Sequence, residues 1–239
     1  MDFVKHEVEW NSEKVSRIWD HYASTLSGQN QYFGEHSGGH VVKYLSKKIN
    51  FSKLGKILDF GCGPGDVMNH FLKYLKPNQE LYGLDFSLDS IQRVQERFRN
   101  NPVVKDAIFT QQLPCNYPGS FFDLIISTET IEHLGDQELK GMLTETQRLL
   151  KKDGFMVLTT PNDENLDAGK VLCPDCGCIF HKWQHVRNWN VKTIKQEMSK
   201  YGFQKLLIDE VHWTSTFRKM LTFIKPLPLN SLVYIGKKI

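Results

Sequence analysis

Glu129, Glu132 and His133 are side chains whose types and spacing could do chemistry. Their i, i+3, i+4 spacing would place all three on one face of a helical turn. Two carboxylates offer the hard oxygen ligands that Mg²⁺ and Mn²⁺ prefer, and an imidazole nitrogen shifts the preference toward Mn²⁺ or Zn²⁺. One alternative is a solvated helix start, because acidic residues favour the first helical turn. Another is a metal-free site in which Glu132 and His133 are general bases.

The elements on either side would position this cluster at the edge of a sheet. Residues 121–127, FFDLIIS, predict a buried strand directly before it, and a helix is expected from about Asp136 to Leu150. Open α/β sheets bind ligands beyond the carboxyl ends of their strands, which is where Glu129 would lie.

A second candidate site is the glycine-rich stretch at residues 56–66, KILDFGCGPGD. The apolar run before Asp59 predicts a buried strand, and Asp66 opens an amphipathic helix. Such a turn brings a ligand against bare backbone and a helix N-terminus. The G-x-G-x-G spacing differs from the G-x-G-x-x-G of dinucleotide sites. Asp59 would repel a pyrophosphate but suits a ligand with a cationic amino group.

The next predicted strand, residues 81–85, ends in Asp85, which could accept both hydroxyls of a ribose. Together the two stretches resemble the class I S-adenosylmethionine-dependent methyltransferases, whose first strand runs into LDxGCGxG and whose second ends in an acid. The alternative is a Rossmann-like nicotinamide domain. The resemblance implies S-adenosylmethionine as cofactor, with Thr128 beside its methionine end and a glutamine, Gln111 or Gln112, at the adenine edge. The full set of expected cofactor-binding residues is Asp59, Gly61, Cys62, Gly63, Gly65, Asp85, Phe86, Gln111 and Thr128.

The E-x-x-E-H sequence resembles two methyltransferase groups, the ubiquinone-pathway O-methyltransferases and the small-RNA 3′-terminal 2′-O-methyltransferases. In both, the motif holds a divalent metal that chelates the acceptor oxygens. The RNA group adds a later histidine followed by a tryptophan, which His185 and Trp189 match. The resemblance implies four ligands: Glu129, Glu132, His133 and His185. The catalytic base would be His181, His185 if it is not a ligand, or metal-bound water.

Three of the five cysteines lie within residues 173–178. C-P-x-C-G is a knuckle that presents two thiolates, Cys173 and Cys176, to one zinc ion. Cys178 and His181 would complete the site. The alternative is a reduced, metal-free loop over the substrate. This segment also resembles bacterial methyltransferases of sugar and cell-surface biosynthesis.

The composition is that of an ordinary globular protein, with 239 residues, 40% hydrophobic and 24% charged residues. The formal net charge of +3 is too small to argue for nucleic acid. No apolar run reaches the length of a membrane span, and the charged N-terminus does not look like a signal peptide. We therefore expect a cytoplasmic protein.

Alternating strands and helices predict a Rossmann-like, doubly wound α/β sheet of seven strands. It would be mostly parallel with an antiparallel last strand, and helices would cover both faces. Residues 1–50 would form a helical segment that caps the cofactor or covers the sheet, and residues 51–239 the core. A Cys/His-rich insertion is expected at about 162–190, and a short helix near 217–224.

These features favour an O-methyltransferase that acts on a hydroxyl of a small molecule or sugar, assisted by Mg²⁺ or Mn²⁺. An RNA terminal ribose is the second acceptor class, disfavoured by the weak net charge and the absence of a basic stripe. A non-catalytic binding module that uses the zinc knuckle is a rival, opposed by the intact glycine loop. The sequence leaves the acceptor and the oligomeric state open.

Overall fold

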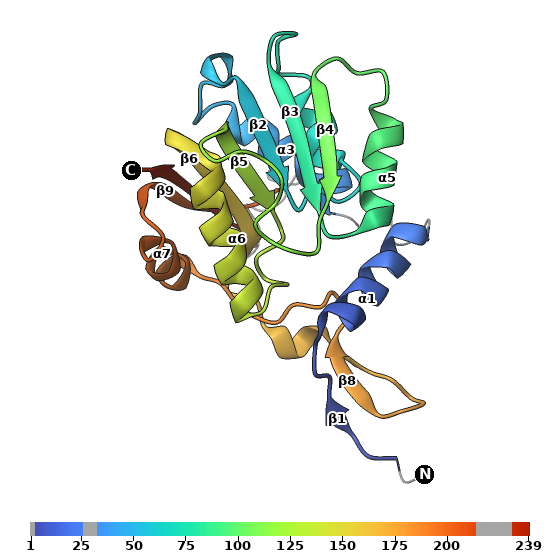
Figure 1. Cartoon of the computed structure of the whole chain (residues 1–239). Coiled ribbons are helices and arrows are strands. Elements are labelled where there is room, and N and C mark those ends of the chain that lie inside the picture. Colours follow the sequence, from blue (N-terminus) through green and yellow to red (C-terminus); the bar gives the residue numbers. More distant parts are fainter. Residues whose placement is uncertain (1–2, 26–32, 214–230) are drawn as a thin grey trace, which may run out of the picture.

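A seven-stranded sheet forms the centre of the computed structural model, which describes residues 3–25, 33–213 and 231–239 (Figure 1). The strand order is β4-β3-β2-β5-β6-β10-β9, and β10 runs antiparallel to both of its neighbours. The strands are β2 (Lys56–Phe60), β3 (Glu80–Asp85), β4 (Val104–Phe109), β5 (Phe122–Thr128), β6 (Leu150–Pro161), β9 (Phe203–Val211) and β10 (Ser231–Lys238). The predicted doubly wound sheet of seven strands is confirmed.

Helices pack on both faces of this sheet. One face is covered by α3 (Phe33–Leu45), α4 (Asp66–Phe71) and α5 (Leu88–Arg97), and the other by α6 (Asp136–Leu149) and α7 (Val191–Ser199). An N-terminal helix, α1 (Ser12–Ser24), lies at one end of the sheet. Two short 3₁₀ helices, η1 (Phe51–Lys53) and η2 (Leu166–Gly169), complete the described helices.

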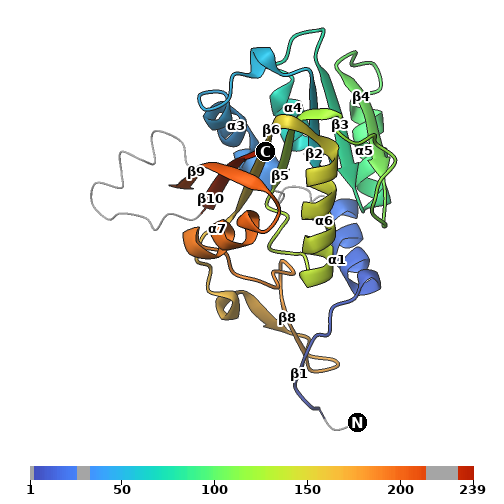
Figure 2. The same cartoon turned by 60° about the vertical axis from the view of Figure 1, so that its left-hand side comes forward.

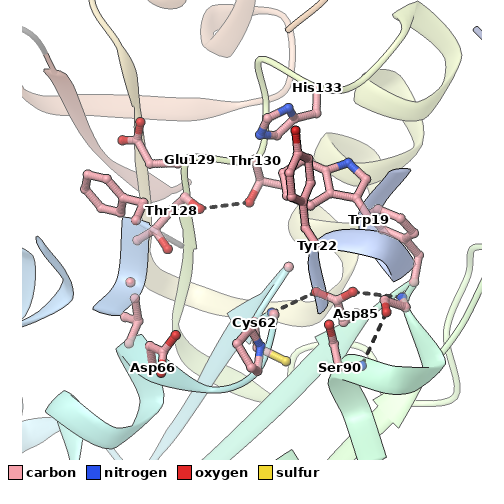
Figure 3. A pocket seen from close by; sticks show the side chains of 18 of the residues that line it. Trp19, Tyr22, Cys62, Asp66, Asp85, Ser90, Thr128, Glu129, Thr130 and His133 are labelled. Carbon is pink, nitrogen blue, oxygen red and sulfur yellow. Dashed lines mark hydrogen bonds between the residues drawn. The ribbon is translucent and has the colours of Figure 1, made fainter. Parts of the chain in front are cut away.

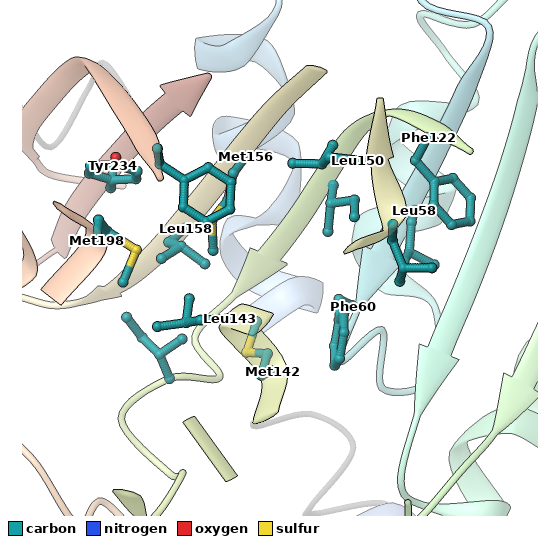
Figure 4. Packing of buried hydrophobic residues seen from close by; sticks show 14 of the residues in the cluster. Leu58, Phe60, Phe122, Met142, Leu143, Leu150, Met156, Leu158, Met198 and Tyr234 are labelled. Atoms are coloured by element: carbon teal, nitrogen blue, oxygen red, sulfur yellow. The ribbon is translucent and has the colours of Figure 1, made fainter. Parts of the chain in front are cut away.

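Two apolar clusters sandwich the sheet because side chains alternate along each strand. In β5, Ile125 packs with α6 and α7, whereas Leu124 and Ile126 pack with the helices on the other face. In β6, Leu158 belongs to the first cluster and Val157 to the second. Figure 4 shows the first cluster, with residues of β2, β5, β6, α6, α7 and β10 packed together. This double burial holds the strand ends, and hence the loops after them, in fixed positions.

A second, three-stranded sheet was not predicted. It has the order β1-β8-β7 and is formed by β1 (His6–Glu7), β7 (Lys170–Leu172) and β8 (Cys178–His181). β1 pairs in parallel with β8, so the N-terminus and the insertion after β6 form one unit. Both views place this small sheet beside α1, at the same end of the large sheet (Figures 1 and 2).

Gly38 and Gly39 lie inside α3, where the His70 ring packs against them and a Cβ at position 38 would lie 3.0 Å from that ring. Residues 151–154 belong to the long strand β6. The helix expected near residues 217–224 lies outside the described residues. Among the helices described, none combines the length and apolar character required to cross a bilayer.

Candidate active site

The glycine-rich turn after β2 is held against the end of β3. The amides of Gly61 and Cys62 donate to the Leu84 carbonyl at 2.7 and 3.1 Å, and the Gly63 amide donates to Asp85 Oδ2 at 2.8 Å. Gly61 has φ +81°, and a Cβ there would lie 2.8 Å from Thr130 Oγ1. Only glycine combines this backbone conformation with so close an approach.

Gly65 serves a different purpose from the first two glycines. It has φ +86°, and a Cβ there would lie 2.8 Å from the Phe98 ring and 3.1 Å from Val94. The third glycine therefore allows the start of α4 to pack against α5, and it is not part of the cavity wall.

Asp59 is fully buried at the end of β2, and neither of its carboxylate oxygens has a hydrogen-bond partner among the described residues. Burial, with Asp85 and Asp66 nearby, raises the pKa of Asp59 to about 8. Asp85 accepts from the amides of Gly63 and Ser87, and burial raises its pKa to about 6. An unpaired buried carboxyl is costly unless a cationic group meets it.

A cavity of about 280 Å³ lies above this turn. Figure 3 shows Cys62, Asp66 and Asp85 on one side of it and Glu129 and His133 on the other. The expected cofactor residues that line it are Gly61, Cys62, Gly63, Asp85, Phe86 and Thr128. Asp59 and Gly65 lie behind the wall, and Gln111 is exposed outside it.

The E-x-x-E-H segment is a loop, so the expected helical turn from Glu129 to His133 is wrong. Glu129 has φ +46°, its amide donates to the Thr159 carbonyl at 2.9 Å, and the His133 amide donates to the Thr130 carbonyl at 3.1 Å. Helix α6 begins only at Asp136. The tight turn nevertheless directs Glu129, Glu132 and His133 into the cavity wall.

Glu132 is buried and Glu129 and His133 are half-buried, and each of the three has a buried polar atom that is unpaired. Glu129 Oε1, Glu132 Oε1 and His133 Nδ1 lack hydrogen-bond partners within the described ranges. Thr160 Oγ1 donates to Glu132 Oε2 at 2.9 Å, and His133 Nε2 lies 3.8 Å from Glu132 Oε1.

Burial dominates the ionisation of the same groups. It raises the pKa of Glu129 to about 8 and, with Glu129 nearby, raises the pKa of Glu132 well above its usual range. Burial and the neighbouring His185 lower the pKa of His133 to about 3. The cluster therefore carries less charge than its composition suggests and would gain from a bound cation.

The segment after β6 brings His185 to this loop. Single ligand atoms of Glu132, His133 and His185 all lie within 4.8 Å of one another. Glu129 lines the same cavity but lies outside this set. Of the four expected metal ligands, the structure therefore groups three closely, with the fourth in the adjoining wall.

The same segment contributes a residue that the sequence analysis missed, Glu164. It forms a second set within 4.8 Å with His181 and His185. His181 is buried and is not part of the cavity wall. The signal available in the sequence was an acid three residues beyond the end of β6, and nothing in its spacing to His185 marks the contact.

Gln184, also missed, joins three parts of the site. Its Nε2 donates to the His133 carbonyl at 2.7 Å, and its Oε1 accepts from Trp19 Nε1 at 2.9 Å. Tyr22 of α1 donates to the Lys182 carbonyl at 2.7 Å and packs against Trp183. Helix α1 thus closes one side of the cavity, where Figure 3 shows Trp19 and Tyr22 next to His133.

The predicted zinc set of three cysteines and His181 is not assembled. Cys178 and His181 are three residues apart in β8, so their side chains point to opposite faces of the strand. His181 contacts His185 instead, with stacked rings 4.5 Å apart. Among the described residues, the cysteines belong to no set of three ligand atoms within 4.8 Å.

Comparison with known proteins defines the class. Residues 29–208 match the family described as methyltransferase domain, so the chain belongs to that family. A crystal structure of an S-adenosylmethionine-dependent methyltransferase from Archaeoglobus fulgidus superimposes with a TM-score of 0.60 at 17% identity, covering 84% of this chain and 95% of that one. Fold and family together define the class of S-adenosylmethionine-dependent methyltransferases.

Two curated relatives differ in the atom that they methylate. A malonyl-[acyl-carrier protein] O-methyltransferase from Magnetococcus marinus is 26% identical over 59% of this chain and 52% of its own length. A ubiquinone/menaquinone biosynthesis C-methyltransferase from Geotalea uraniireducens is 25% identical over 67% of this chain and 68% of its own length. The chain spans only about half the length of the first of these, so its acceptor must be argued from the site.

Proposed function

We propose that the chain transfers a methyl group from S-adenosylmethionine to a hydroxyl of a small molecule or sugar, with Mg²⁺ or Mn²⁺ held by Glu129, Glu132, His133 and His185. One observation carries the proposal: buried, unpaired oxygen and nitrogen atoms of the E-x-x-E-H loop line the same cavity as the glycine-rich turn. Buried polar groups are normally satisfied, and a divalent cation would satisfy this donor set.

The residues of the glycine-rich turn fit the cofactor. Asp85, already oriented by two amides, suits a pair of ribose hydroxyls. The unpaired carboxyl of Asp59 lies behind the cavity wall, so its expected attraction for the ammonium of the methionine part would act across the glycine-rich turn. The absence of side chains at Gly61 and Gly63 leaves the backbone open to close approach. Thr128 lies in the wall between this turn and the E-x-x-E-H loop.

The chain's own residues would then orient and shield the reaction. A bound divalent ion would lower the pKa of the acceptor hydroxyl and hold its oxygen in place. Glu132 is held for this by Thr160, and His133 by its place in the loop that Gln184 fastens. Trp19 and Tyr22, which line the cavity, would shield it from water. The transfer is a direct displacement, so its rate depends on how well the acceptor oxygen is aligned with the methyl group on the sulfonium of the cofactor.

A metal-free reaction is the second candidate, and one observation favours it. His133 Nδ1 lies buried without a hydrogen-bond partner among the described residues, so it is a nitrogen that could accept the proton, and burial keeps this imidazole neutral. Glu132, with a raised pKa, would instead hold a proton at neutral pH.

Turnover with radiolabelled S-adenosylmethionine separates the two candidates. Acceptors would be screened as sets of catechols, sugar diols and RNA 3′ ends, each with chelator-treated protein and after addition of Mn²⁺. We expect a diol or sugar to be methylated only after Mn²⁺ is restored. Equal turnover in the presence of chelator would support the metal-free reaction, and methylation of RNA alone would replace the acceptor class.

We further propose that the cysteine hairpin, residues 173–178 at the turn between β7 and β8, binds zinc without His181. The amides of Asp175 and Cys176 hydrogen-bond to the Cys173 thiol and lower its pKa, and Gly177, with φ +78°, donates its amide to the Cys173 carbonyl at 3.0 Å. This arrangement favours a thiolate pair at Cys173 and Cys176. Elemental analysis of the Cys173→Ser/Cys176→Ser variant should show loss of one zinc per chain, and unchanged zinc would exclude the site.

A further inference from the structure

Glu164 touches the candidate metal site only through a histidine. Its Oε2 lies 2.5 Å from His185 Nδ1, and its Oε1 lies 3.7 Å from His181 Nε2. The carboxylate is partly buried, with its side chain 26% exposed, and does not line the cavity. It follows the end of β6, and its charge is close enough to the E-x-x-E-H loop to help raise the pKa of Glu129 and Glu132. Glu132 and His133 of that loop lie within reach of the same His185 ring.

This contact determines which nitrogen of His185 carries the proton. An ionised carboxylate only accepts hydrogen bonds, so the Nδ1 that faces Glu164 must be the protonated nitrogen of a neutral ring. The other nitrogen, Nε2, then has a free lone pair. That lone pair is what a cation held by Glu132 and His133 would require from His185.

A rigid frame fixes the pair. The His185 amide donates to His181 Nδ1 at 3.2 Å, and the two rings stack 4.5 Å apart. Gly169, at the end of η2, packs directly against His181, where any Cβ would overlap the ring. The Val186 amide donates to the Glu132 carbonyl at 2.9 Å, which ties the segment after His185 back to the loop.

We propose that Glu164 is a positioning residue that sets the tautomer and orientation of His185, so that Nε2 completes the cation site with Glu132 and His133. The proposal rests on the proposed function for the identity of the cation, but the tautomer of His185 does not depend on it. Glu164 acts through His185 and has no contact with the reacting groups.

The first test is ¹⁵N NMR of histidine-labelled protein, with the His185 signal assigned by its loss in His185→Gln. In the wild type without metal we expect the proton on Nδ1. Glu164→Ala should shift the ring toward the Nε2-protonated form, while the signals of the other histidines outside the cluster stay in place. A wild-type His185 protonated on Nε2 would overturn the proposal.

The second test is Mn²⁺ binding measured by calorimetry, with Mn²⁺ alone as the probe. Glu164→Gln and Glu164→Ala should weaken binding by about 10- to 100-fold, because loss of the orienting carboxylate typically costs that much. Asp167→Asn is the matched control: it removes an exposed carboxylate three residues away and should leave Mn²⁺ affinity unchanged.

The outcomes separate the two proposals. If the wild type binds no Mn²⁺, the metal part of the proposed function fails and the NMR result alone decides the role of Glu164. If Glu132→Gln retains Mn²⁺ while Glu164→Ala loses it, Glu164 is itself a ligand with His181 and His185, and the positioning role is wrong. Wild-type affinity in both Glu164 variants would also overturn it.

Discussion

The two halves of the cavity are built in different ways. The glycine-rich half comes from one continuous stretch and the next strand end, and its contacts, such as Gly63 to Asp85, join neighbouring strands β2 and β3. The E-x-x-E-H half needs a second segment, residues 162–189, that returns from the end of β6 and is fastened through Gln184 and Val186. The first half is therefore an intrinsic feature of the sheet, whereas the second is assembled on it.

This difference predicts that the two halves can be damaged independently. Substitutions in the glycine-rich half should weaken cofactor binding and spare the cation, and those in the assembled half should do the reverse. A substitution where residues 162–189 are fastened to the E-x-x-E-H loop, such as at Gln184, should affect the assembled half alone.

The largest expected effect is on turnover in Glu132→Gln. The change keeps the size of a fully buried side chain but removes the charge that a cation would need. We expect turnover to fall at least about 100-fold, because loss of a metal's several kcal/mol of transition-state stabilisation corresponds to that factor or more. S-adenosylmethionine affinity should stay within about twofold. The exposed Glu138→Gln serves as control, and equal turnover in the two variants would contradict the prediction.

The corresponding substitution in the glycine-rich half is Asp85→Ala. Hydrogen bonds to a charged group contribute about 1.5–3 kcal/mol, so its loss should weaken S-adenosylmethionine binding about 10- to 100-fold. Mn²⁺ binding should not change, since Asp85 lies in the other half of the cavity (Figure 3). Calorimetry with each ligand measures both, and a parallel loss of Mn²⁺ affinity would show that the halves are not independent.

Asp59→Asn should lower the affinity for the cofactor and raise the stability of the fold. Because the pKa of Asp59 is raised to about 8, the folded chain keeps a proton that the unfolded chain releases near pH 4. The free energy of unfolding without ligand should therefore fall as pH rises from about 4 to 8, by at most about 1.4 kcal/mol per pH unit. Asp59→Asn should reduce this slope and weaken S-adenosylmethionine binding. Urea unfolding at pH 5 and 8 tests it, and identical slopes in both proteins would count against the argument.

The smallest expected effect is at Gln184, which fastens residues 162–189 to the E-x-x-E-H loop. Gln184→Ala leaves the His133 carbonyl and Trp19 Nε1 without this partner, which should cost about 1–3 kcal/mol of stability. Mn²⁺ affinity should fall while S-adenosylmethionine affinity is kept. Asn188→Ala, at a long 3.4 Å contact in the same segment, is the control. A larger loss of cofactor than of Mn²⁺ would reverse the assignment of Gln184 to the assembled half.

The sequence was sufficient for the parts of the molecule that depend on local pattern. The alternation of strands and helices, the acids at the ends of β2 and β3, and the turn between them follow from hydrophobic period and glycine placement. It was insufficient where contacts join distant segments. Glu164 and Gln184 act through neighbours 21 and 51 residues away, His185 and His133 respectively, and no spacing rule marks such pairs.

Errors in the prediction have the same physical origin. The i, i+3, i+4 spacing of the E-x-x-E-H sequence is compatible with a helix, but the left-handed conformation of Glu129 and the pairing of its amide with β6 override it. His181 was grouped with the cysteines by its nearness in sequence. The alternation of side chains in β8 places it on the other face, toward His185.

The most direct test of the account is a calorimetric titration of Mn²⁺ into the chelator-treated wild type and Glu132→Gln, each with and without saturating S-adenosylmethionine. The account predicts one Mn²⁺ per chain at the wild-type E-x-x-E-H loop, its loss in Glu132→Gln, and undiminished cofactor binding in both. Absence of Mn²⁺ binding in the wild type, or equal binding in the variant, would contradict a cation site in the assembled half of the cavity.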